Sequence, residues 1–493
     1  MKDESKFSKV LSILLSVVLV ISSFYLLYQV IRLNVLPSKF LFPLTIGVVV
    51  LDAIFILLLI YFSKNVVSKI VCILLTLFIC VATCMGGYYI SKTQNVLSNI
   101  TNVAKHAKNT VSVIVKESSS IKNKSQLNDV SVGSLRLNEQ GSKKVLKELS
   151  GEGIVLNQTE YDSMTALLEA FYNGEVDSII INESSRSQIL DMEAYSNFDS
   201  NTRVVYQTSY KVKNNDSATS VSDITSKPFN VLISGSDTRG GFDENGRSDV
   251  IMIATVNPKT HTILLTSVPR DFYVTTACDA GDGCMQGALD KITHTGIHGT
   301  NTTKRTVEQL LGIEINYTFK VGFDTVTELV DVLGGVDVYV EPGYATTTSE
   351  FSVHEGVNHL NAQQALAFAR ERYSYTEGDR QRTKNQQQVL MGIVKEATKP
   401  SVITNYAAIM DTMANTFSTT MSNEEITDLI KYQLNNNPSW KMEQYMVDGT
   451  GDTLMCAELG DAASVMVPDQ STVKMAKDKI NAVLAGKSSE DVK

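Results

Sequence analysis

Three apolar stretches near the N-terminus limit most strongly what this chain can become. They cover residues 10–31, 40–62 and 70–90, and each reaches the roughly 20 residues that an α-helix needs to cross a bilayer. A cleaved secretory signal would supply a single, shorter stretch. The sequence therefore predicts an anchored protein whose residues 1–92 form three transmembrane helices.

Basic residues around these stretches predict their orientation. Lys2, Lys6 and Lys9 precede the first stretch, and Lys64 and Lys69 separate the second from the third. Because cytoplasmic loops are enriched in Lys and Arg, we expect a cytoplasmic N-terminus and an external location for everything after the third helix. ATP and GTP are absent outside the cell, so a transfer reaction there needs a donor that arrives activated, such as a lipid pyrophosphate.

Charge and cysteine content further limit the partners and the covalent cross-links that this chain can have. The formal net charge of −9 and the absence of a Lys/Arg-rich block argue against a nucleic-acid partner. Cys278 and Cys284 flank a short Asp/Gly-rich stretch, where either a disulfide or two unpaired loop thiols fit, and Cys456 has no evident partner.

The external part divides into two α/β regions. Residues 105–213 alternate short β-branched runs with helical stretches such as 161–172, which predicts a small accessory domain, and the polar residues 214–227 predict a linker. Residues 228–485 carry apolar strands joined by tight turns, and then helical patterns interspersed with further strands. This order predicts an α/β or α-β-α sandwich. The expected strands are 230–233, 250–256, 262–267, 317–321 and 336–340, and the expected helices are 303–311, 325–333, 362–372 and 380–397.

Three strand ends of the second region carry Asp and Arg. Residues 235–241 form a glycine-rich loop containing Asp237, but the Lys-Ser/Thr pair of a nucleotide-triphosphate loop is absent. The next strand starts after Arg247 and Asp249, and Arg270 follows the third. Because α/β folds place ligands at strand ends, we expect these side chains to meet, although exposed charge pairs are the simpler alternative.

A polar helix adds to this set. Asn361 and Gln364 have the spacing of a capping box at the start of one helix. In the next helix, Asp379, Arg382 and Gln386 share a face. We expect the neighbouring residues Arg380, Lys384 and Gln387 to point elsewhere, into solvent.

Arginines in this number predict a phosphate ligand. Guanidinium groups match phosphate oxygens bidentately and keep their charge, so a cluster of them suits a pyrophosphate. Carboxylates can share that site only through a divalent cation, for which Mg²⁺ is the expected ion and Mn²⁺ the alternative. The arginines in question are Arg247, Arg270, Arg370, Arg372 and Arg382.

With these motifs, the chain resembles the LytR-CpsA-Psr family, particularly its capsule-associated branch with three membrane spans and an extra external domain. The resemblance is strongest over residues 229–398. Its most specific parts are residues 231–239, 247–249, 267–271, 290–294 and 369–387.

The resemblance implies an α-β-α sandwich with an apolar pocket for a polyprenyl tail, and a reaction in a bacterial cell membrane. Glycopolymer phosphate would pass from a polyprenyl-pyrophosphate carrier to a peptidoglycan hydroxyl, with capsular polysaccharide as the expected polymer and the capsule assembly machinery as a further partner. Asp237 and Asp249 would hold Mg²⁺, and Arg270 and Asp379 would join them in catalysis, Asp379 by orienting the arginines or as a base. Pyrophosphate would be bound by Arg247, Arg270, Arg370, Arg372, Arg382 and Gln386.

Other interpretations remain open at this point. His294 is a candidate general base, because the unperturbed pKa of a histidine side chain lies near neutrality. A packing or capping role is more usual for a histidine in such a position. The same site could hydrolyse a lipid pyrophosphate, with water in place of the acceptor hydroxyl. A non-enzymatic regulator of polysaccharide assembly is the third reading.

Overall fold

The computed structural model describes most of the chain, and its residues group into two compact units. The first, here called the helical unit, comprises Met1–Asn99, Thr398–Ala414 and Ser422–Pro438, and the second, the main unit, comprises Ile100–Ala397, Asn415–Met421 and Ser439–Lys493. The described residues are 6–62, 65–103, 106–213, 217–236, 244–279, 283–399, 408–409, 412 and 417–492.

The helical unit contains α1 (Lys6–Leu33), α2 (Ser38–Leu57, continued by a π-helical turn to Phe62), most of α3 (Val66–Val103) and α13 (Asn423–Asn436). Small residues let α1 and α3 approach closely: a Cβ atom at Gly87 would lie 2.5 Å from the ring of Tyr25. The Oγ1 atom of Thr83 donates a hydrogen bond to Ser22 at 3.0 Å.

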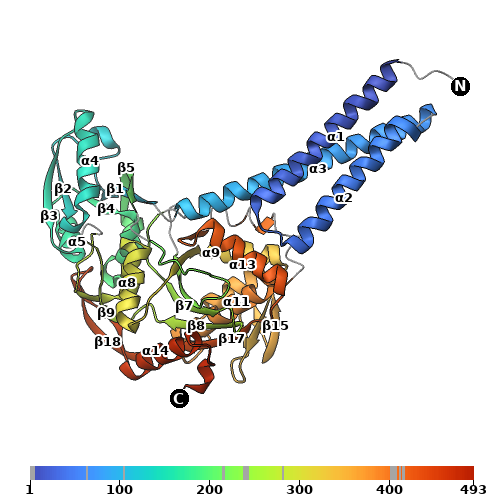
Figure 1. Ribbon diagram of the computed structural model, residues 1–493. Coiled ribbons are helices and arrows are strands. Elements are labelled where there is room, and N and C mark those ends of the chain that lie inside the picture. The colour runs from blue at the N-terminus through green and yellow to red at the C-terminus, as the bar shows by residue number, and fades with distance from the viewer. Residues whose placement is uncertain are drawn as a thin grey trace. The chain divides into compact units, whose positions relative to one another are not determined.

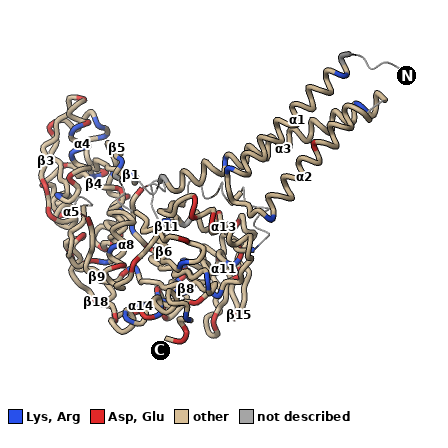
Figure 2. The backbone as a smooth tube through the Cα atoms, in the orientation of Figure 1, with Lys and Arg blue, Asp and Glu red and all other residues tan. Residues whose placement is uncertain are grey.

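The outward surface of these helices is apolar. Ile21, Phe24, Ile46 and Phe78 are each more than 60% exposed, and Figure 2 shows almost no charge between the helix ends. Three stretches, Ser8–Leu33, Ser38–Phe62 and Val66–Thr101, are long and apolar enough to cross a membrane. The three predicted apolar helices are therefore present in the fold.

A five-stranded sheet of order β3-β2-β4-β1-β5, here called the accessory sheet, forms the first part of the main unit. The central strand β4 pairs antiparallel with β1 and parallel with β2. Val111 and Val113 of β1 contact α4 (Glu139–Gly151) on one face, while Ile114 packs with α5 (Met164–Asn173) on the other. The strands are β1 (His106–Lys116), β2 (Val130–Leu135), β3 (Leu156–Tyr161), β4 (Ser178–Asn182) and β5 (Thr202–Lys213), and the short helices are α6 (Arg186–Asp191) and α7 (Phe198–Asn201).

A six-stranded sheet of order β16-β11-β6-β7-β8-β17 forms the centre of the rest (Figure 1). β6, β7 and β8 make an antiparallel meander, while β11 joins β6 and β17 joins β8 in parallel. The strands are β6 (Phe229–Ser236), β7 (Val250–Asn257), β8 (Thr262–Val268), β11 (Tyr317–Gly322), β16 (Phe417–Thr419) and β17 (Lys441–Met446).

Helices cover both faces of this sheet. On one face, α8 (Thr300–Leu311) and α14 (Gln470–Leu484) pack their apolar side chains on Leu232, Ile253 and Leu264. On the other, α11 (Asp379–Ala397) contacts β8 and β17, and α9 (Phe323–Leu333) contacts β11. The predicted α-β-α sandwich is confirmed. Two-stranded ribbons complete it: β9 (Tyr273–Thr275) with β10 (Leu289–Lys291), β12 (Val336–Val340) with β15 (Gly356–Leu360), β13 (Thr346–Thr347) with β14 (Ser352–Val353), and β18 (Gly449–Cys456) with β19 (Asp461–Pro468).

Most predicted elements coincide with observed ones, and the differences lie at their ends. The helix expected over 161–172 begins only at Met164, because Tyr161 ends β3 and Ser163 caps the helix by accepting a hydrogen bond from Ala166 N. The helix α10 (Ala362–Arg370) begins with the predicted capping box of Asn361 and Gln364. The predicted domain limits stay a prediction, since residues 106–213 share the main unit with the six-stranded sheet.

Candidate functional site

The strand pairing brings three predicted strand ends together at one edge of the six-stranded sheet. Gly235 at the end of β6 lies opposite Val250 at the start of β7, and Ile251 lies opposite Val268 at the end of β8. Asp249 comes just before Val250 and Arg270 lies two residues after Val268. Their side chains form an ion pair of 2.8 Å between Oδ1 and Nη1.

Arg247 and the accessory sheet contribute to the same place. One nitrogen of Arg247, Nη2, lies 4.0 Å from Asp249 Oδ1, and another, Nη1, forms an ion pair with Asp191 of α6. The Arg247 side chain is only 15% exposed. Asp191 was missed in the sequence, because it lies in the accessory region, where no pattern pointed to the cluster.

The helix α11 brings a second set of charges to this edge. Arg382 forms an ion pair with Asp379 one turn earlier. Burial lowers the pKa of Arg382 and the nearby positive charges of Arg270 and Arg372 lower it further, against the opposing effect of Asp379. The guanidinium groups of Arg270 and Arg372 therefore lie close enough to Arg382 to repel it.

Arg270 is also surrounded by charged groups, but its pKa shifts in the opposite direction from that of Arg382. Burial lowers its pKa, but the carboxylates of Asp249, Asp271 and Asp379 outweigh burial and raise it. Arg270 is thus a permanent cation held among acids. We define the set Asp249, Arg247, Arg270, Arg372, Asp379 and Arg382 as the arginine cluster.

Three donors of the arginine cluster lack a hydrogen-bond acceptor among the described residues. The Nε atoms of Arg247, Arg270 and Arg382 are buried and donate to no acceptor within the part of the chain that the structure describes. A buried donor without an acceptor costs about 1–3 kcal/mol, and more when it belongs to a charged group. Oxygens of a bound phosphate would remove this cost, so the cluster has the chemistry of an anion site.

The turn that follows β10 holds the backbone of the cluster in place. Thr293 accepts a hydrogen bond from Ser248 N and donates its own N–H to Arg270 O, each at 3.0 Å. Gly296 packs so tightly that a Cβ atom there would lie 2.5 Å from Gly246 O. This segment therefore positions the backbone at Arg247, Asp249 and Arg270.

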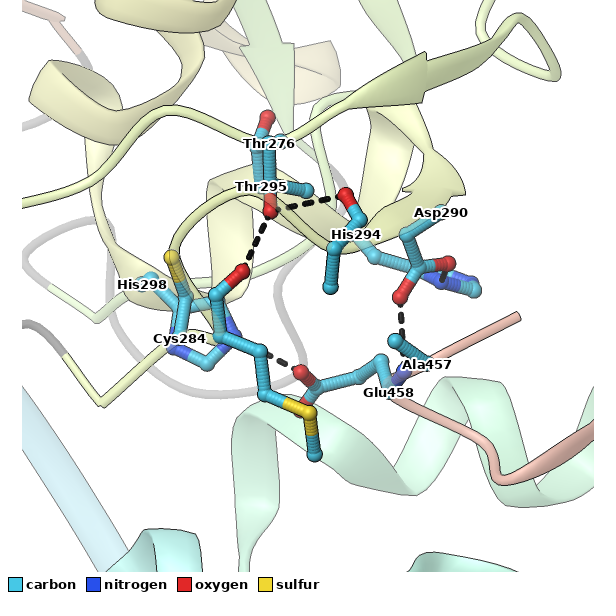
Figure 3. Close-up of a pocket in the computed structure, with 10 residues that line it drawn as sticks. Thr276, Cys284, Asp290, His294, Thr295, His298, Ala457 and Glu458 are labelled. Carbon is cyan, nitrogen blue, oxygen red and sulfur yellow. Dashed lines mark hydrogen bonds and ion pairs between the residues drawn. The ribbon is translucent and has the colours of Figure 1, made fainter.

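Asp290 and His294 anchor that turn. The two side chains are almost fully buried, with Asp290 Oδ1 2.7 Å from His294 Nδ1, and Asp290 also accepts hydrogen bonds from Lys291 N and Glu458 N. Burial raises the pKa of Asp290, but the bonds to His294 and to these backbone groups outweigh burial and lower it. Figure 3 shows both residues on the wall of a small pocket, whose volume is about 10 Å³. These contacts favour the packing role of His294 over a general base.

The two cysteines of the Asp/Gly-rich stretch are joined. Cys278 and Cys284 form a disulfide with their Cα atoms 6.4 Å apart, which settles the alternatives left open by their spacing. Cys456 is a buried free thiol, and burial raises its pKa to about 12.

The ion pairs and charge interactions of the arginine cluster given above do not include three of the predicted site residues. Asp237 lies outside the described residues. Arg370 ends α10 with an exposed side chain, and Gln386 is half-buried on α11. Their predicted roles in binding metal or pyrophosphate stay predictions.

The expectation for the rest of α11 was only partly right. Arg380 points away from the cluster, to Asp448 at 2.7 Å. Gln387 does not point into solvent: it is 1% exposed and its Nε2 donates to Tyr445 O at 2.8 Å and Leu265 O at 3.3 Å. Gln387 was expected to face water because it lies on a polar helix. Its amide instead donates hydrogen bonds to backbone carbonyls of β8 and β17.

The carboxylates fit a divalent cation in part. Both ion pairs of Asp249 go through Oδ1, which leaves Oδ2 for a cation. One carboxylate together with phosphate oxygens and water is a usual environment for Mg²⁺. Within the described residues no group of three or more His, Cys, Asp or Glu side chains could hold a metal without such a ligand.

Fold and site together describe an α/β protein with three apolar N-terminal helices and a cluster of largely buried arginines at a sheet edge. The model of the LytR_cpsA_psr family matches residues 194–482, more than half of the chain, and the chain belongs to that family. A relative from Bacillus cereus (strain AH820), named polyisoprenyl-teichoic acid–peptidoglycan teichoic acid transferase TagU, is 31% identical over 241 residues, which are 48% of this chain and 76% of the relative.

Two further relatives complete the comparison. TagU from Bacillus subtilis (strain 168), under the same name, is 34% identical over 203 residues, which are 41% of this chain and 63% of the relative. The crystal structure of B. subtilis TagU superposes with a TM-score of 0.40 and 28% identity, covering 52% of this chain and 97% of that one.

Proposed function

We propose that this protein is a membrane-anchored phosphotransferase that attaches a glycopolymer from a polyprenyl-pyrophosphate carrier to peptidoglycan. Membership of the family and the names of its relatives support this reaction class. The observation that carries the proposal is the arginine cluster, whose three unpartnered Nε donors match a diphosphate better than any neutral ligand.

The reaction is a displacement at phosphorus. The acceptor hydroxyl oxygen of peptidoglycan forms a bond to the phosphorus that carries the glycan, and the bond from that phosphorus to the oxygen of polyprenyl phosphate breaks. Polyprenyl phosphate leaves, and the hydroxyl proton is released. Protein catalysis of such a transfer consists mainly of positioning and charge neutralisation.

The residues divide this work between them. Arg247, Arg270 and Arg382 bind the pyrophosphate, with Arg370, Arg372 and Gln386 as further contacts carried over from the family. Asp379 orients Arg382 through their ion pair. Asp249, with Asp237 just after β6 in the sequence, would hold Mg²⁺, which neutralises charge on the phosphates when bound.

Capsular polysaccharide is the polymer we propose, because three membrane helices precede an extra domain, as in the capsule-associated branch of the family. The relatives named above carry teichoic acid in their names, so that polymer is the alternative. Under this proposal the N-terminus is cytoplasmic, the main unit is external, and capsule assembly proteins are further partners.

The test is transfer of labelled glycan from polyprenyl pyrophosphate to peptidoglycan by the full chain in detergent. Arg270→Ala should lower the rate by about 10²–10³-fold, the range seen when one charge-stabilising donor is removed from an active site. Arg380→Ala is the matched control, since Arg380 lies on α11 but pairs with Asp448. Equal rates for both variants would overturn the assignment of the site.

A further inference from the structure

A second cavity, of about 470 Å³, lies within the main unit between the accessory sheet and the segment after β10. Its volume falls within the roughly 300–1,000 Å³ of small-molecule sites. The accessory side contributes Asn109, Asn138 and Tyr210, and the other side contributes His298 and Asn301. The proposed reaction at the arginine cluster gives this cavity no role.

The wall of the cavity is rich in amides that lack partners. Asn138 is 9% exposed, and neither its Oδ1 nor its Nδ2 has a hydrogen-bond partner among the described residues. The Oδ1 atoms of Asn109 and Asn182 are in the same state. Because an unsatisfied buried polar atom costs about 1–3 kcal/mol, a polar occupant that draws these amides into hydrogen bonds would stabilise the fold.

The ionisable side chains of the wall already have partners. His298 Nε2 lies 3.0 Å from Glu458 Oε2, and each of these side chains is 11% exposed. Arg136 forms an ion pair of 2.7 Å with Asp162, and Glu139 pairs with Lys143. An occupant therefore needs many hydrogen-bonding groups but no charge.

We propose that this cavity binds an uncharged sugar segment. Sugar hydroxyls both donate and accept hydrogen bonds, as do the Asn side chains that face them. Tyr210 adds an aromatic surface, and burial raises the pKa of its hydroxyl, which stays protonated and accepts a bond from Asn109 Nδ2 at 3.4 Å. A pocket with aromatic surface and a few convergent polar groups is typical of small-molecule recognition.

The cavity also lies close to the arginine cluster along the chain. Asn245 lines the cavity, and Arg247 and Asp249 lie two and four residues further along the chain. Two residues span at most about 7 Å and four at most about 14 Å. His298 and Glu458 lie on the wall of this cavity and also of the small pocket in Figure 3, next to the turn that positions the cluster. The sugar site thus rests on the proposed function, as the subsite that holds glycan beside the transferred phosphate.

Two substrates contain such a sugar segment, the peptidoglycan acceptor and the glycan of the donor. Binding of each is measured by calorimetry with the full chain in detergent, using peptidoglycan fragments released by a muramidase and phosphate-free oligomers of the surface polysaccharide. No lipid donor is present, so this binding does not depend on transfer.

Two variants test the cavity. Asn138→Leu removes the amide at similar size, and Asn138 makes no capping hydrogen bond that the change would break. Gly141→Ala keeps the amide but displaces it, since a Cβ atom there would lie 2.5 Å from Asn138 Oδ1. Asn157→Leu, on the exposed surface of β3, is the matched control.

We expect both cavity variants to bind one of the two glycans at least about tenfold more weakly, with the control unchanged and all three proteins folded by thermal unfolding. The glycan that loses affinity identifies the source of the sugar. Undetectable binding of both glycans by the wild type, or equal affinity in both folded variants, would overturn the sugar site. Arg270→Ala separates the two proposals, because it should retain sugar binding even where transfer is lost.

Discussion

At the scale of single residues, the arginine cluster consists of opposite charges that are largely buried, so that water screens them only weakly. Arg247, Asp249 and Arg382 are each less than 16% exposed. Opposite charges at short range in such surroundings interact far more strongly than exposed pairs. An exposed surface pair would be worth about 0–1 kcal/mol, so the burial of these side chains separates a site from ordinary surface charge.

Asp379 tests how the residues of the cluster share their work. Asp379→Asn should lower the transfer rate about tenfold, because the neutral amide holds Arg382 less firmly, while the pH profile of the rate keeps its shape. Transfer rates from pH 5 to 9 make the comparison. Loss of the acidic limb of that profile would contradict the orienting role and indicate a general base. Glu371→Gln, outside the cluster, serves as the control.

At the scale of elements, β10 and the turn after it determine the geometry of the cluster. Gly296→Ala should destabilise the protein by about 1–3 kcal/mol, because the new methyl group overpacks against Gly246 O and Ser248. The transfer rate should fall as Arg247 moves. Thermal unfolding and the transfer assay measure both effects.

Gly151→Ala is the matched change at the end of α4, where a Cβ atom would meet nothing within 4 Å. Neither glycine has a positive φ, so backbone strain does not separate the two sites. An unchanged melting temperature and rate for Gly296→Ala would show that the turn does not position the site.

The edge strand β17 makes stability depend on pH. Burial raises the pKa of Glu443, but hydrogen bonds from Ser489, Lys441 and Ser488 outweigh burial and lower it from 4.5 to about 2. Stability from this group is therefore fully present above about pH 4.5 and is lost as the pH falls toward 2. The deficit in melting temperature of Glu443→Gln should be largest at neutral pH and should shrink over this range; a deficit independent of pH would contradict the assignment.

Much of the fold and part of the site could be predicted from the sequence. What could not be predicted depends on contacts between segments that are distant in the sequence. Strand periodicity and turn residues located β6, β7 and β8, and helical spacing paired Asp379 with Arg382. Local patterns do not report which distant segments touch. The contact of Asp191 with Arg247 and the buried bonds of Gln387 therefore came only from the structure.

At the scale of the whole molecule, the accessory sheet and the six-stranded sheet meet at Glu244. This buried carboxylate contacts Lys108 Nζ at 3.3 Å and Thr110, both on β1, while its backbone carbonyl accepts a hydrogen bond from Lys320 of β11. Because Arg247 lies three residues further on, the two sheets are joined next to the arginine cluster.

The orientation in the membrane is tested by fusing alkaline phosphatase, which folds only where disulfides form, behind chosen residues. Fusions after Val35 and at the C-terminus should be active, and one after Asn65 should be inactive, because basic residues keep that loop in the cytoplasm. Activity only after Asn65 would reverse the topology and place the site inside the cell.

The measurement that tests the central claim most directly is the identity of the products formed from labelled polyprenyl-pyrophosphate glycan with peptidoglycan present. A transferase yields glycan joined to peptidoglycan through one phosphate, together with an equal amount of polyprenyl phosphate, and Arg270→Ala slows the formation of both about 10²–10³-fold. Free glycan phosphate formed at the same rate with or without peptidoglycan would instead mean hydrolysis, and would contradict the account.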